Sequence, residues 1–86
     1  MDKNNQSFNK TRDILKAIPK VEVKGKREIT VENHTGIVIF DKDIVKLKTK
    51  IGILNIYGDE FNLLFMNGST LVIEGDFKSL EYEGEA

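Results

Sequence analysis

The sequence predicts an all-β domain, an antiparallel meander of seven to eight short strands curled into a small sandwich or roll, with one short N-terminal α-helix. Three observations predict it. From Pro19 onward, apolar and polar side chains alternate with a period of two, the spacing of half-buried strands. Turn signals interrupt this alternation roughly every eight or nine residues. Before Pro19, the apolar residues follow a helical spacing instead.

The helix is expected over residues 11–18, because Pro19 disfavours helix at the residue before it. Two or three turns are not stable alone, so this helix must dock on something. It can cover the open face of its own sheet, or it can dock on a partner or an anionic membrane surface. The residues that would make this contact are Arg12, Ile14, Leu15 and Ile18.

The strands follow in order. They are centred on Val21 and Val23, Ile29 and Val31, "IVIF", Val45 and Leu47, Leu54 and Ile56, Phe61 to Phe65, Leu71 and Ile73, and Phe77 to Tyr82. The turns between them are expected at "GKR", "NHTG", "DKD", "GDE", "NGS" and Gly75-Asp76. "IVIF" is apolar on both faces, so we expect it to be a central strand. The predicted core is Ile29, Val31, Ile37, Ile39, Val45, Leu47, Leu54, Ile56, Leu63, Leu71 and Ile73.

A faint repeat lies within this pattern. The segment "LNIYGD" at residues 54–59 resembles "LVIEGD" at residues 71–76, which indicates one strand-turn-strand unit used twice. Two copies are too few to form a β-solenoid.

Length and composition set the boundaries of the fold. The 86 residues form one domain, with a disordered lead-in expected over 1–10, the folded domain over 11–82 and an acidic tail over 83–86. Without cysteine, the chain can form no disulfide, thiolate zinc site or cysteine nucleophile. No apolar run approaches the ~20 residues of a membrane span, and the N-terminus lacks a signal-peptide core. We therefore expect a cytoplasmic protein.

The only histidine, His34, stands in "ENHTG", where Asn33 and Gly36 are expected to supply positive-φ positions. A metal site needs several convergent ligands, and a catalytic histidine needs a nucleophile beside it. Neither companion is evident, so we interpret His34 as part of a turn. The paired acids, Asp41 with Asp43 and Asp59 with Glu60, are likewise interpreted as turn residues. We expect no catalytic residue, metal or cofactor.

The most regular charged feature is the row Lys46, Lys48 and Lys50. At this spacing the three ammonium groups would share one face of a strand, about 7 Å apart. Such a row can follow a phosphate backbone, or it can be a solvated face or a protected edge. Eight basic residues against four acidic ones in residues 1–28, and five against ten in the remainder, leave the body acidic, which disfavours a polyanion partner.

With the elements in this order, the sequence resembles the YabP/YqfC family of sporulation proteins, and is most similar to its YqfC-type branch. The resemblance covers residues 11–82, through "AIPKV", "ITVENHTGIVIFDKDIVKLKTKIGILNIYG" and "LVIEGDFKSLEY". Its most specific portions are Glu32-Asn33-His34 with Gly36, the strand from Gly52 to Gly58, and Glu74-Gly75. In this branch a basic residue commonly stands where this chain has Thr35.

The resemblance implies a mother-cell protein needed for the forespore envelope and associated with membrane-embedded sporulation proteins. It implies no active-site residues. We therefore predict a non-enzymatic structural or interaction protein that works through itself or a membrane-associated partner. The alternative is a small β-barrel that binds nucleic acid or another polyanion through its lysine row. The candidate interface residues are Arg12, Ile14, Leu15, Ile18, His34, Lys46, Lys48 and Lys50.

Overall fold

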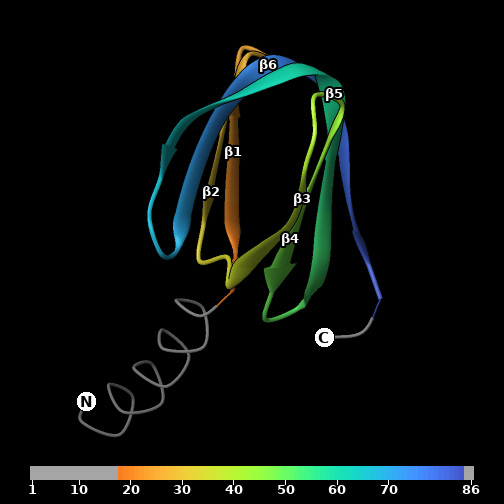
Figure 1. Ribbon diagram of the computed structural model, residues 1–86. Coiled ribbons are helices and arrows are strands. Elements are labelled where there is room, and N and C mark those ends of the chain that lie inside the picture. The colour runs from red at the N-terminus through yellow and green to blue at the C-terminus, as the bar shows by residue number, and fades with distance from the viewer. Residues whose placement is uncertain (1–17, 85–86) are drawn as a thin grey trace, which may run out of the picture.

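A computed structural model describes residues 18–84, and these form one six-stranded antiparallel sheet (Figure 1). The all-β prediction is confirmed. The predicted lead-in, and the predicted helix up to residue 17, lie outside the described residues. The strands are β1 (Lys20–Lys24), β2 (Glu28–Glu32), β3 (Gly36–Phe40), β4 (Ile44–Thr49), β5 (Gly52–Met66) and β6 (Thr70–Glu83).

The sheet has six strands where the sequence predicted seven to eight, because two expected turns are bends within strands. The "GDE" segment lies inside β5 and Gly75-Asp76 lies inside β6. Asp59 and Asp76 are opposite each other in the β5–β6 register, so both strands bend at the same place. The meander prediction is also wrong: the strand order is β1-β2-β6-β5-β4-β3, so β2 pairs with β6 and β3 does not follow it in the sheet.

The bend folds the sheet onto itself, and its two halves face each other (Figure 1). One half contains β1, β2, the start of β6 and the end of β5. The other contains β3, β4, the start of β5 and the end of β6. Nine side chains from both halves form the core: Ile29, Val31, Val45, Leu47, Leu54, Ile56, Phe61, Leu71 and Ile73.

Eight of the eleven predicted core residues are therefore confirmed and three are wrong. Ile37, Ile39 and Leu63 are exposed, because their strand segments have a neighbour on one side only in the described part of the chain. The prediction that "IVIF" is central is wrong for the same reason, since β3 is the last strand of the sheet. Phe61, which the sequence analysis did not place in the core, is buried at the bend.

Glycine permits the bend. A Cβ on Gly58 would overlap the backbone oxygen of Asp76 and lie 2.5 Å from the Phe61 ring. A Cβ on Gly75 would lie 2.7 Å from the same ring, and Gly75 has a φ of 153°. Phe61 thus packs against both glycines, where any larger residue would collide with it.

The turns of the β1–β2 and β3–β4 hairpins form backbone hydrogen bonds with the bend. In the β3–β4 turn, the backbone oxygen of Asp43 accepts a hydrogen bond from Gly58 N at 3.1 Å. In the β1–β2 turn, the oxygen of Arg27 accepts one from Gly75 N at 2.9 Å. Each half therefore consists of three parts. These are one hairpin, one copy of the six-residue repeat (71–76 with β1–β2, 54–59 with β3–β4), and the C-terminal end of the other long strand. The repeat in the sequence corresponds to this approximate two-fold symmetry.

Candidate interaction surface

β3 is an edge strand that is apolar on both faces. Ile37 pairs with Leu47 on the core side, whereas Ile39 pairs with Lys46 on the outer side. The register shifts between them, which makes Val38 a bulge residue that is 47% exposed. Within the described part of the chain, only β4 pairs with this strand.

The end of β5 forms a second edge of the same kind. β4 pairs only with residues 52–57 of β5, so residues 62–66 have β6 as their sole neighbour within residues 18–84. Leu63 and Met66 pair with core residues of β6, and Phe65 pairs with Val72 on the opposite face. All four side chains from Leu63 to Met66 are about half exposed.

These two segments, β3 and residues 62–66 of β5, are called the apolar edges below, and they differ from β1, which is also an edge strand within residues 18–84. There Lys20, Glu22 and Lys24 are exposed and alternate with half-buried valines. Charged edge strands resist pairing with other chains, whereas neutral apolar ones favour it. Contiguous apolar side chains on a sheet edge are typical of a protein-binding surface.

His34 lies in the connection between β2 and β3, where the chain passes from one half to the other. Asn33 has a φ of 69°, so its predicted positive-φ role is confirmed. Gly36 instead begins β3 without a positive φ, and that part of the prediction is wrong. The backbone N–H groups of Asn33 and His34 both donate to Ser69 O, and Thr35 N donates to Lys48 O.

This connection is more deeply packed than a surface turn. His34 is 5% exposed, and neither ring nitrogen has a hydrogen-bond partner among the described residues. The Asn33 side chain donates to Ile18 O at 3.0 Å and fixes the start of the described chain to the connection. Ile18 is half-buried there, while Arg12, Ile14 and Leu15 lie outside the described residues.

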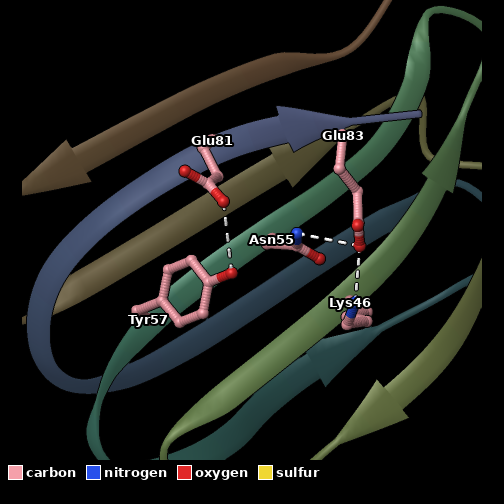
Figure 2. A network of polar contacts seen from close by, with 5 residues as sticks. All are labelled: Lys46, Asn55, Tyr57, Glu81 and Glu83. Atoms are coloured by element: carbon pink, nitrogen blue, oxygen red, sulfur yellow. Dashed lines mark hydrogen bonds and ion pairs between the residues drawn. The ribbon is translucent and has the colours of Figure 1, made fainter. Parts of the chain in front are cut away.

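The lysine row is shorter than predicted. Lys46 and Lys48 lie on the outer face of β4, but Lys50 lies in the turn after it. Lys46 is paired with Glu83, and Asn55 Nδ2 donates to the same carboxylate at 3.0 Å (Figure 2). The hydrogen bond that Lys46 donates to the Glu83 carboxylate raises the pKa of Lys46. Because its charge is compensated within the fold, Lys46 is poorly suited to bind a polyanion.

Sequence reasoning missed the other members of this network. Asn55 is 1% exposed although it lies on the outer face of the sheet, where its side chain points to the Glu83 carboxylate (Figure 2). Tyr57 donates to Glu81 at 3.4 Å beside it. Only the register of β4, β5 and β6 brings these residues together, and no local sequence signal marks it.

Asp41 and Asp43 lie between β3 and β4, in the predicted turn. Asp59 and Glu60 lie inside β5 at the bend rather than in a turn, so that part of the prediction is wrong. Asp59 forms an ion pair with Lys78 at 3.0 Å. Within residues 18–84, no three His, Cys, Asp or Glu residues converge as metal ligands would. No helix in this part of the chain is long and apolar enough to cross a membrane.

The described part of the chain is thus a bent antiparallel sheet with two apolar edges. Comparison with known proteins supplies the family. The YabP family model matches residues 16–86, so the chain belongs to the YabP family, and the predicted YabP/YqfC resemblance is confirmed. The chain is 27% identical over 70 residues to the uncharacterized protein YqfC of Bacillus subtilis (strain 168). That match covers 81% of this chain and 75% of the relative.

Proposed function

We propose that this protein is a non-enzymatic structural or interaction protein of endospore formation. Its membership of the YabP/YqfC family suggests a sporulation-related protein. We place it in the mother-cell cytoplasm, peripheral at the forespore membrane, where it takes part in assembly of the forespore envelope. It acts by associating with itself or with a membrane-associated partner.

The observation that carries this proposal is the pair of apolar edges. Seven large apolar side chains are between 37% and 51% exposed on the two apolar edges, and among residues 18–84 each of these edges is paired along one side only. Exposed apolar strands of this kind recruit an added strand from another chain. The outer face of β4, by contrast, carries Lys46 already paired with Glu83, which favours a protein partner over nucleic acid.

The test is deletion of the gene in its spore-forming host, followed by complementation. We expect deletion to lower the yield of heat-resistant spores, and the wild-type gene to restore it. Phe65→Lys places a charge on an apolar edge and should restore it poorly. Ile51→Lys is the matched control, since Ile51 is 47% exposed but lies in the β4–β5 turn.

A fluorescent fusion and a pull-down from sporulating cells complete the test. We expect the fusion to gather at the forespore boundary in the mother cell. Full spore yield in the deletion strain would contradict a role in sporulation. Equal complementation by Phe65→Lys and wild type would contradict a role for the apolar edges.

A further inference from the structure

β3 and residues 62–66 of β5 have the composition of internal strands and the position of edge strands. A strand that is apolar on both faces is normally covered on both faces and paired on both sides. Neither strand contains a charged residue, and each lacks a second neighbour within residues 18–84. Each is therefore suited to receive one more strand.

We propose that a second copy of this chain provides that strand. β3 of one copy pairs with residues 62–66 of the other, and a two-fold axis generates the same contact again. This inference rests on the proposed function and specifies its self-associating form.

The exposed area supports a closed dimer of this kind. Side chains of this size at the observed exposure present roughly 80–100 Å² each, so the seven on the apolar edges present about 600 Å² per copy. Covering them in both copies buries roughly 1,200 Å², which is the lower range of stable protein interfaces. Pairing β3 with β3 alone would cover three of the seven and leave the longer run, Leu63 to Met66, exposed.

The character of the two strands also favours pairing between copies. Both are neutral, so they meet without an unpaired charge in the interface, whereas β1 would bring its two lysines and its glutamate to any contact. Each apolar edge carries a register shift, at Val38 and at Leu64. Bulges on edge strands oppose regular lateral addition, which disfavours a sheet that grows without limit.

The first experiment is light scattering of the full chain across about 1–300 µM, a range that covers weak homodimers. We expect a dimer at the upper end. Val38→Lys and Phe65→Lys should each raise the dimer dissociation constant at least about tenfold. Ile51→Lys should leave it unchanged. Circular dichroism of each variant checks that the monomer still folds, because all three sites are about half exposed.

If the protein is a monomer throughout this range, the proposal is overturned. This holds whether residues 1–17 cover the apolar edges or the edges stay uncovered. A dimer that is insensitive to Val38→Lys and Phe65→Lys, or weakened as much by Ile51→Lys, would also overturn it. Polymers that grow with concentration would overturn it as well, because a closed two-fold dimer cannot add further copies.

The second experiment determines which strands pair, and the absence of cysteine from the chain makes it clean. Val38→Cys and Leu64→Cys variants are prepared separately, mixed and oxidised. We expect the mixed disulfide to form faster than either homodisulfide. Predominant Val38→Cys homodisulfide would indicate β3–β3 pairing and overturn the proposed arrangement.

The two proposals fail separately. A monomer that still recovers a sporulation partner and still supports spore formation would remove the dimer and leave the proposed function standing. If the protein dimerises but deletion of its gene leaves spore yield unchanged, the dimer stands and the proposed function is wrong.

Discussion

At the scale of single residues, His34 is the least expected feature, because it is buried while both ring nitrogens lack a partner among residues 18–84. An unsatisfied buried polar group costs stability, whereas an apolar side chain of similar size does not carry that cost. We therefore expect the free energy of unfolding of His34→Leu, measured by thermal melting, to lie within about 1 kcal/mol of that of the parent or above it. A much larger loss would show that the imidazole has a polar partner. If the variant folds normally but loses a binding partner in pull-downs, His34 belongs to an interface.

Glu83 gives a residue-scale prediction about pH. The hydrogen bonds that Glu83 accepts, first from Lys46 and then from Asn55, hold the pKa of its carboxyl below the ordinary 4.5. The resulting stabilisation is present above pH 4.5 and is lost as the pH falls through the pKa of Glu83 in the folded protein. The same contact raises the pKa of Lys46 above 10.5, so its contribution is lost as the pH rises through that folded value. We expect Glu83→Gln to lower Tm between about pH 5 and pH 10, with the difference closing at more acidic pH.

The control for this prediction is Glu22→Gln, an exposed position on β1. It should change Tm little at any pH. A difference between Glu83→Gln and the parent that stays constant into strong acid would show that the Glu83 ion pair does not stabilise the fold.

At the scale of the elements, the bend in β5 decides whether the sheet can fold onto itself. Gly58→Ala would drive its Cβ into the backbone of β6 and the ring of Phe61, whereas Gly36→Ala meets nothing within 4 Å. We expect Gly58→Ala to destabilise the protein by about 3 kcal/mol or more, and Gly36→Ala by less than about 1 kcal/mol, in urea unfolding. Equal effects would mean that the strand bends without needing a glycine at this position.

At the scale of the whole molecule, the approximate two-fold symmetry predicts that the halves unfold together. Ile56 and Ile73 occupy equivalent places in the repeat, and both are fully buried in the shared core. Ile56→Ala and Ile73→Ala should each cost about 2–5 kcal/mol and leave one cooperative transition. Ile39→Ala, on the edge, should cost less than about 1.5 kcal/mol. Two separate transitions in either core variant would show that the halves are independent.

Much of the local structure could be predicted from sequence, since it depends on neighbours along the chain. The period-two alternation identified the strand segments and eight of the nine core residues, and Asn33 was correctly assigned to a positive-φ position. The family was equally evident from the order of the segments. What failed was any inference that required knowing which strand lies beside which.

The sequence by itself determined that the domain described by residues 18–84 is all-β, where most core residues lie, and that one segment is used twice. Only the tertiary structure decided that "GDE" and Gly75-Asp76 are bends rather than turns, because a glycine-aspartate pair suits both and the pairing of β5 with β6 makes the choice. It also decided that Ile37, Ile39 and Leu63 are exposed. Their apolar character is local, but burial depends on a neighbouring strand, and within the described residues the fold gives these strands only one.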